Sequence, residues 1–278
     1  MADKKKSIIP TIILSIISII WIYPIVMILF NSLKVESAIT TSGVFQFPTS
    51  ETWNGIQNFI ASVTQMDFLK SFWYSLVISV MSVVLILLCC SMCAWYIVRV
   101  NGLLSKVLYY LCVFSMVVPF QMVMFTLAKT ADTLKLNNPY TICIVYLGFG
   151  AGLAVEIMVG FKIGIKILKK TCRGLHPSIM AASSISSGLP FTKPVNINTA
   201  ILELMWVWND YLLPTLVLDI KKYKTIPMAI QYFRGSYGHV QMGPMMASIM
   251  IDIIPIIVVY LVCQKYIIEG VVAGAVKG

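Results

Sequence analysis

Four acidic residues lie inside long apolar stretches, and they are the side chains best placed to do chemistry in this sequence. They are Glu156, Glu203, Asp210 and Asp252. An ionisable group within a membrane-spanning segment is costly, so it usually belongs to a solute pathway or makes a buried polar contact. Two interpretations of Asp210 stay open: a functional or structural polar contact, or an acid that merely reaches the outer end of its segment.

No catalytic or metal-binding pattern accompanies these acids. The two histidines, His176 and His239, form no HExxH pair, and the GxxxxGK[ST] loop that cradles phosphate in ATPases does not occur. The seven cysteines form no paired CxxC…CxxC pattern and no framework of secreted disulfides, so we interpret them as small packing residues. The sequence therefore predicts neither an enzyme nor a cofactor or metal bound by this chain.

The composition indicates a membrane protein. Of the 278 residues, 59% are hydrophobic and only 12% are charged, and the mean hydropathy is +0.87. A soluble domain carries about 25% charged residues, so this apolar excess does not fit one water-soluble core. Lipid offers no hydrogen bonds to a bare backbone, and the apolar runs are continuous rather than alternating. We therefore expect helices rather than a barrel.

Six apolar runs predict an all-α membrane protein with six transmembrane helices in a single domain. The first run follows "MADKKKS", which looks like the start of a signal peptide. That run is too long for a signal core and has no small-residue cleavage site, so we expect a retained helix. The domain covers residues 1–278, with spans at about 7–33, 71–98, 106–128, 140–161, 197–218 and 244–266.

The distribution of basic residues predicts the orientation of the helices, because loops on the cytoplasmic side are rich in lysine and arginine. Lys4–Lys6 precede the first run, Arg99 and Lys106 flank a short loop, and a basic cluster occupies 162–173. The loop 219–241 is an exception, since it is basic but predicted to lie outside. The bias still favours both termini in the cytoplasm, and it explains the net charge of +10 without nucleic acid.

Prolines and glycines interrupt several of the apolar runs. Pro119 stands in "VVPFQM", three glycines stand in "LGFGAGL", Pro214 ends "WNDYLLP", and Pro255 stands in "DIIPII". Such residues commonly produce ordinary kinks in membrane helices. They also occur where bent helices pack closely around a cavity for a crossing solute. The pattern alone does not decide between the two.

These motifs resemble one family. "VVPFQMVMFTLAKTADTL", "YLGFGAGLAV", "AILELMWVWNDYLLPTLVLDIKKYKTIPMAIQYFRGSYG" and the terminal "GVVAGAVKG" are similar to permease subunits of bacterial carbohydrate-uptake ABC importers. The similarity is to the second permease of maltose-type systems, and it covers nearly the whole chain. It implies the type I importer permease fold and a multi-pass subunit of the bacterial plasma membrane.

The resemblance also implies partners and functional residues. Such a permease encloses the sugar path together with a second, different permease, while two cytoplasmic ATPase subunits bind ATP. An extracellular sugar-binding protein docks on the outside, where the last external loop reaches into it, and the C-terminal tail lies at the ATPase interface. The implied residues are Gly235, Ser236, Tyr237 and Gly238 in the loop, Gly274, Ala275, Val276, Lys277 and Gly278 in the tail, and Asn209 and Asp210 as candidates for the translocation path.

The loop 162–190 stands where this family has its coupling helix, which sits in a groove of the ATPase. The family pattern is E-E-A-A, then D-G, then a helix that ends in L-P-x-x-K-P. The ending is intact in "LPFTKP", but residues 170–173 replace E-E-A-A and His176-Pro177 replaces D-G at a family-like spacing. A proline and five added positive charges would fit such a groove poorly, so no ATPase contact is assigned within 162–186.

A preserved length with a changed sequence suggests a shifted reading frame that is later restored. Out of frame, codons for Glu-Ala-Cys-Thr can encode Gly174-Leu175-His176, and codons for Asp-Gly-Cys can encode Met180-Ala181-Ala182. Glu156, at a position that the family usually makes apolar, would mark the start of the change. Rapid divergence and a new interface are the alternatives.

Two other functions stay open besides that of a sugar permease. One is a permease for polyamine or phosphate, which the sugar-type C-terminal tail disfavours. The other is a membrane-embedded enzyme, which would need acids or histidines that converge near one membrane face. The acids of this chain are scattered and both histidines lie in predicted loops, so the sugar permease is favoured.

Overall fold

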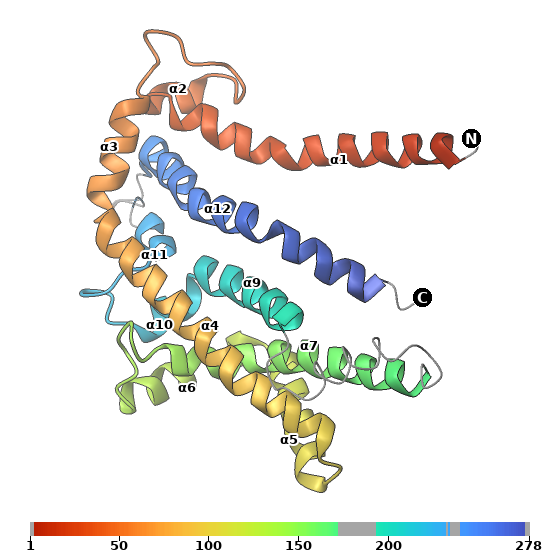
Figure 1. Cartoon of the computed structure of the whole chain (residues 1–278). Coiled ribbons are helices and arrows are strands. Elements are labelled where there is room, and N and C mark those ends of the chain that lie inside the picture. The colour runs from red at the N-terminus through yellow and green to blue at the C-terminus, as the bar shows by residue number, and fades with distance from the viewer. Residues whose placement is uncertain (1–2, 172–192, 232, 234–239, 276–278) are drawn as a thin grey trace. The chain divides into compact units, whose positions relative to one another are not determined.

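The computed structural model describes residues 3–171, 193–231, 233 and 240–275, and its regular elements are helices (Figure 1). The all-α fold class expected from the continuous apolar runs is confirmed for this part of the chain. In chain order the helices are α1 (Asp3–Ser32), α2 (Glu36–Thr41), α3 (Gly55–Gln65), α4 (Phe68–Arg99), α5 (Leu103–Val117), α6 (Phe120–Thr133), α7 (Cys143–Thr171), α9 (Lys193–Asn209), α10 (Leu212–Val217), α11 (Ile226–Gln231) and α12 (Met242–Ala275).

Four helices among the described residues are long and apolar enough to cross a membrane: Pro10–Ser32, Phe68–Arg99, Cys143–Phe161 and Met242–Tyr266. Helices α5 and α6 would add a fifth span if they are taken together, although they are bent by 107°. The predicted run 197–218 is divided between α9 and α10 and does not form one long helix. The number of six spans therefore remains a prediction.

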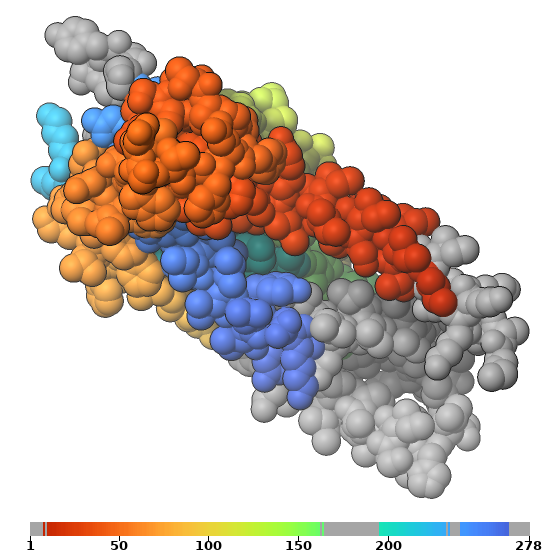
Figure 2. All heavy atoms as spheres, turned by 90° about the horizontal axis from the view of Figure 1, so that it is seen from above, coloured from red at the N-terminus to blue at the C-terminus, as the bar shows by residue number. Residues whose placement is uncertain are grey.

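The apolar side chains of α1 are exposed along the helix, and 0% of its most apolar window is buried (Figure 2). An apolar surface of this extent is unusual on a soluble monomer and is normal in contact with lipid. In contrast, 39% of the corresponding window of α4 and 44% of that of α7 are buried. These two helices therefore provide much of the packed interior.

The residues that interrupt the apolar runs have different effects. Helices α5 and α6 meet at Pro119 with a sharp bend. Helix α7 continues through its three glycines and α12 continues through Pro255, which corrects the expectation that these residues break their runs. In α7 a glycine serves close packing, because a methyl group at Gly152 would lie 2.8 Å from the carbonyl oxygen of Cys112 in α5.

The contacts divide the chain into two compact units. The first comprises residues 1–68 and 229–255, and the second comprises residues 69–228 and 256–278. The first unit contains α1 to α3 and the start of α12, while the second contains nearly all of α4 to α10.

Side-chain hydrogen bonds hold the loops of the first unit. The Asn58 side chain of α3 donates to the carbonyl oxygens of Ser32 and Lys34, at 2.8 and 2.9 Å. The Glu36 carboxylate of α2 accepts hydrogen bonds from the first two N–H groups of α12, at 3.0 and 3.2 Å. Because a helix begins with N–H groups that lack partners, Glu36 both satisfies these donors and complements the helix dipole.

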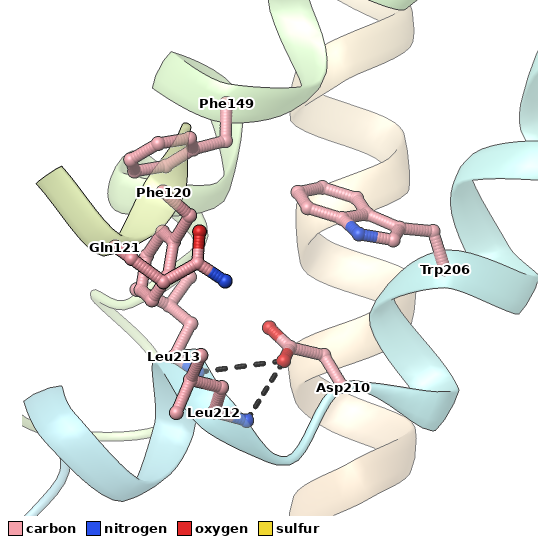
Figure 3. Close-up of a pocket in the computed structure, with 7 residues that line it drawn as sticks. All are labelled: Phe120, Gln121, Phe149, Trp206, Asp210, Leu212 and Leu213. Carbon is pink, nitrogen blue, oxygen red and sulfur yellow. Dashed lines mark hydrogen bonds between the residues drawn. The ribbon is translucent and has the colours of Figure 1, made fainter. Parts of the chain in front are cut away.

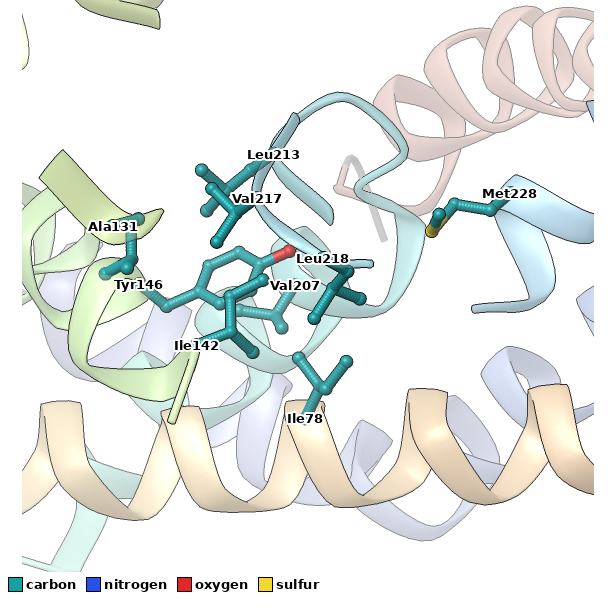
Figure 4. Close-up of a cluster of buried hydrophobic side chains, with 10 residues drawn as sticks. Ile78, Ala131, Ile142, Tyr146, Val207, Leu213, Val217, Leu218 and Met228 are labelled. Atoms are coloured by element: carbon teal, nitrogen blue, oxygen red, sulfur yellow. The ribbon is translucent and has the colours of Figure 1, made fainter. Parts of the chain in front are cut away.

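Two buried apolar clusters hold the second unit. One packs α4 against α7 around Ile86 and Val155. The other surrounds Tyr146 of α7, whose ring lies among side chains from α4, α6, α9 and α10 (Figure 4). This second cluster contains Ile78, Ala131, Ile142, Val145, Tyr146, Val207, Leu213, Val217, Leu218 and Met228.

Candidate functional site

One cavity in the second unit brings together three of the interrupted segments (Figure 3). Its volume is about 210 Å³. The start of α6, the glycine-rich part of α7 and the junction of α9 with α10 all contribute to its walls. The lining residues are Phe120, Gln121, Phe149, Trp206, Asp210, Leu212 and Leu213.

The bend at Pro119 positions the part of the wall that comes from α6. Proline has no N–H group, and its ring fixes φ, which is −62° here. It also disfavours the helical conformation at the preceding residue, so α5 ends just before it. A new helix then begins at Phe120, and this break places Phe120 and Gln121 at the cavity.

Asp210 supplies a carboxylate to the cavity at the point where α9 ends. Its Oδ1 accepts hydrogen bonds from the backbone N–H groups of Leu212 at 2.9 Å and Leu213 at 3.4 Å (Figure 3). These N–H groups belong to the first turn of α10 and have no partner within that helix, so the carboxylate caps it. Its Oδ2 accepts a hydrogen bond from the Tyr146 hydroxyl of α7 at 2.9 Å. Asp210 therefore makes structural polar contacts and lines the cavity as well.

Aromatic rings form much of the cavity wall. Phe120 and Phe149 contact edge to face, with ring centroids 5.3 Å apart. Tyr146 and Trp206 make a similar contact at 5.6 Å. An edge-to-face contact covers only one face of one of its two rings, so other ring faces stay available. The side chain of Trp206 is 41% exposed, so its indole is accessible from outside the chain.

Asn209, the other sequence-predicted candidate for the translocation path, does not line this cavity. Its side chain is exposed, and Nδ2 donates a hydrogen bond to the Met205 carbonyl oxygen one turn earlier, at 2.7 Å. The structure thus brings Asp210 together with the aromatic residues and leaves its neighbour Asn209 on the surface of α9.

Most residues implied by the family resemblance lie outside the described residues, as do both histidines and the coupling segment from residue 172 to 192. The backbone of α7 is helical up to Thr171, at the start of the altered sequence. Gly274 and Ala275 form the end of α12. The implied residues that are not described are Gly235, Ser236, Tyr237 and Gly238 of the external loop and Val276, Lys277 and Gly278 of the tail.

Two other acids singled out from the sequence take part in helix packing away from the cavity. Glu156 of α7 accepts a long hydrogen bond, 3.4 Å, from the Tyr109 hydroxyl of α5. Glu203 of α9 is 1% exposed, and neither carboxylate oxygen has a hydrogen-bond partner among the described residues. A methyl group at Gly150 would lie 2.8 Å from one of these oxygens. Over the described ranges, no three His, Cys, Asp or Glu side chains gather as potential metal ligands.

The aromatic residues and the glutamine of the cavity were not among the residues predicted from the sequence. Phe120 and Gln121 directly follow the proline at the α5–α6 bend, Phe149 lies between two glycines of α7, and Trp206 lies one turn before Asp210. The sequence signal that could have identified these cavity residues was their position next to the proline, the glycines and Asp210. It was weak, because aromatic residues make up 12% of the sequence.

Comparison with known proteins identifies relatives that cover nearly the full chain, although no family model matches it. A probable permease protein of a starch degradation products transport system from Thermoanaerobacterium thermosulfurigenes is 30% identical over an alignment of 273 residues, and the match covers 94% of each chain. A permease protein of a multiple sugar-binding transport system from Streptococcus mutans is 30% identical over 274 residues, covering 96% of this chain and 95% of its own.

A solved structure has a similar fold. It is the crystal structure of a bacterial ABC transporter involved in the import of the acidic polysaccharide alginate, with a TM-score of 0.66 and 20% identity over 95% of this chain and 97% of that one. At this identity the likeness supports the fold alone. Since the two relatives match almost the entire chain at 30% identity, this protein belongs to the family of permease subunits of carbohydrate-uptake ABC importers.

Proposed function

We propose that this chain forms half of the sugar translocation path of an ATP-driven importer and that the cavity lies on this path. The supporting observation is the convergence of Asp210, Gln121 and three aromatic rings at the breaks between α5 and α6 and between α9 and α10. Membrane-embedded solute sites are often built where helices are interrupted, because irregular backbone is tolerated where it lines a cavity. Asn209 is exposed next to Asp210, and we place it on the same path.

The proposed assembly contains a second, different permease, two ATPase subunits and an extracellular sugar-binding protein. This chain lacks the phosphate-binding loop motif, so another subunit must bind ATP. Leu202 and Met205 present exposed apolar side chains on α9, which supports contact with a partner permease. We place residues 274–278 at the ATPase interface and residues 235–238 against the binding protein.

The proposed solute is an oligosaccharide. Two relatives from Bacillus subtilis are a melibiose, raffinose and stachyose import permease and an arabinooligosaccharide permease. These relatives do not decide among oligosaccharides, but they favour sugars over polyamine or phosphate. They also disfavour a membrane-embedded enzyme, since they are transport permeases.

Reconstitution of the complete complex into proteoliposomes tests this function. Labelled maltotriose, raffinose and arabinotriose are offered with the binding protein outside the vesicles and ATP inside. We expect at least one sugar to accumulate, and only when ATP and the binding protein are both present. Labelled putrescine and phosphate serve as controls, and accumulation of either one in place of every sugar would reject the proposal.

We also propose that both termini lie in the cytoplasm, as the basic loops predict. The test introduces a cysteine at Lys4 or at Val276 in a cysteine-free background and applies a membrane-impermeant maleimide to intact cells. Both positions should be protected from the outside and should react after the membrane is permeabilised. Labelling of either position in intact cells would contradict this orientation.

Residues 162–186 are proposed to be the family's coupling segment with a sequence that weakens contact with the ATPase. The intact "LPFTKP" ending, at a family-like distance from the end of the fourth predicted span, supports this placement. An ATPase drives a permease only through an interface that differs between two states, so loss of the acids and small residues would reduce coupling. Replacing 162–186 with an E-E-A-A…D-G helix of equal length gives a variant that we call the restored chain. The restored chain should import sugar faster than the unchanged chain. Equal ATP-driven uptake by the two chains would contradict this role.

A displaced reading frame is the proposed origin of that sequence. The two codon matches begin at different offsets, so they require a further shift between His176 and Met180. Sequencing the gene across codons 150–195 tests this origin directly. A gene in which no alternative frame encodes a family-like motif would reject it and leave rapid divergence or a new interface.

A further inference from the structure

We infer that the cavity binds one ring of the transported carbohydrate, and that the ring is neutral rather than acidic. This subunit would then contact the sugar with Trp206, Gln121 and Asp210 in addition to enclosing the path. The inference rests on the proposed function, because it names what the cavity on the path holds.

The size of the cavity fits a single ring. Its volume of about 210 Å³ is below the roughly 300 to 1,000 Å³ of pockets that enclose whole drug-sized ligands. It is still several times the volume of a water molecule, which takes about 30 Å³ in the liquid. A whole oligosaccharide would therefore exceed this space, and its remaining rings would have to lie outside this cavity.

The aromatic residues suit the apolar faces of a sugar ring. The face of an aromatic ring is electron-rich, whereas the C–H groups of a sugar ring carry partial positive charge. Figure 3 shows Phe120, Phe149 and Gln121 on one side of the space and Trp206 and Asp210 on the other. A ring that enters between the two sides would meet aromatic carbon on both and polar groups at its edge.

The polar residues suit sugar hydroxyl groups. An ionised carboxylate offers about four acceptor sites. The Oδ2 atom of Asp210 accepts one hydrogen bond, from Tyr146, which leaves capacity for a hydroxyl donor. The Gln121 side chain is exposed and carries both donors and an acceptor. A sugar hydroxyl can donate and accept, so it can satisfy both residues.

The charge of Asp210 selects against acidic sugars. Two of its hydrogen bonds come from backbone N–H groups, which can only donate and which favour the ionised form. No basic residue is among those that line the cavity. The carboxylate of a uronic acid would therefore meet a like charge at close range, and no basic residue of the cavity wall would offset the repulsion. Neutral rings avoid this cost.

Protection from alkylation tests the inference without requiring transport. Gln121→Cys is placed in the otherwise unchanged chain and assembled into the complete complex in nanodiscs. Alkylation of position 121 by a maleimide is followed by mass spectrometry while maltotriose, raffinose or arabinotriose is titrated. At least one of these sugars should slow the reaction at position 121. Met122→Cys, which is 77% exposed and next in sequence but not in the cavity wall, should react at an unchanged rate.

Variants of Trp206 separate aromatic contact from general disturbance. In the Gln121→Cys background, Trp206→Leu should raise the sugar concentration for half protection about threefold to tenfold, because an aromatic contact is lost. Trp206→Phe should change it less than about twofold, since an aromatic face remains. Trp73→Leu is the matched control, because Trp73 is 54% exposed on α4 and lies outside the cavity. If Gln121→Cys fails to assemble, Leu212→Cys provides a second probe position.

The outcomes distinguish this inference from the proposed function. If a sugar is imported but protects neither probe position, the inference is overturned while the proposed function stands. If tri-galacturonate protects position 121 as well as the imported neutral sugar does, the selection against acidic rings is wrong. If no sugar is imported even by the restored chain, the proposed function fails and the inference fails with it.

Discussion

The polar cluster of the first unit and the cavity of the second unit use polar side chains in opposite ways. The polar cluster consists of Asn31, Ser32, Lys34 and Asn58, which are at most 4% exposed and bond to nearby groups of their own unit. In the cavity, polar and aromatic groups remain partly accessible. Buried polar groups cost stability unless they are satisfied, so the cluster is built for rigidity. The cavity keeps hydrogen-bonding capacity that a solute can use.

The hydrogen bonds of Lys34 show how fully the polar groups of this cluster are paired. Its Nζ donates to the Asn31 Oδ1 atom at 3.2 Å, the Ser42 Oγ atom at 3.1 Å and the Gly43 carbonyl oxygen at 2.9 Å. An ammonium group has three donors, and all three are used. These acceptors are neutral, and burial lowers the pKa of Lys34 below its ordinary value of 10.5.

The largest effect on stability is expected for Asn58→Ala. This change leaves the buried carbonyl oxygens of Ser32 and Lys34 without their donor, which should cost about 2–4 kcal/mol. The melting temperature of the purified permease in detergent should fall clearly. Gln57→Ala, an exposed change on the same helix, is the control. Equal melting temperatures for the two variants would show that the polar cluster does not hold the first unit.

A pair of glycines on α7 tests the packing around the cavity unit. Gly152→Ala would place a methyl group 2.8 Å from the backbone carbonyl oxygen of Cys112, and such overpacking should cost about 1–3 kcal/mol. Gly148 has nothing within 4 Å of the same position, so Gly148→Ala should leave stability equal or slightly higher. The melting temperatures of the two variants test this difference. A loss of stability in Gly148→Ala but not in Gly152→Ala would contradict the close packing at Gly152.

Tyr146→Phe should have a smaller effect on stability. It removes the hydrogen bond to the Oδ2 atom of Asp210 and keeps the ring in the apolar cluster, so the loss should be about 0.5–1.5 kcal/mol. The backbone bonds from Leu212 and Leu213 to Asp210 remain and should preserve the cap of α10. Tyr110→Phe, at a residue that is 67% exposed, should leave the melting temperature unchanged. If the Tyr146→Phe protein does not fold, the hydrogen bond from Tyr146 to Asp210 contributes far more to stability than a single hydrogen bond should.

The smallest effect concerns pH. Because the pKa of Lys34 is lowered in the folded state, the unfolded chain holds more protons at this site between that lowered pKa and 10.5. Stability from this site should therefore rise as the pH rises through that window. The difference in melting temperature between the wild type and Lys34→Met should show this rise. If the melting temperature of the wild type relative to Lys34→Met stays constant as the pH rises, or falls instead, the burial of a charged Lys34 is contradicted.

The sequence predicted the long helices well because hydrophobic length is a direct requirement of lipid. It also located the bend at Pro119, since proline removes a backbone donor wherever it occurs. It did not show which glycines of α7 serve close packing, as Gly150 and Gly152 do and Gly148 does not, because a glycine has the same sequence signal in either place. The cavity depends on pairs such as Tyr146 and Asp210, which are 64 residues apart, and no local pattern encodes such a pairing.

The difference between the polar cluster and the cavity is tested most directly by sugar uptake per folded complex. This uptake is measured side by side for Asn58→Ala and Trp206→Leu in the restored chain. We expect Asn58→Ala to lower thermal stability but to keep uptake per folded complex within about twofold, because the polar cluster holds structure without contacting sugar. Trp206→Leu should melt near the wild type and lose about threefold to tenfold in uptake. Full uptake by Trp206→Leu, with uptake abolished in folded Asn58→Ala, would show that the polar cluster and not the cavity serves transport.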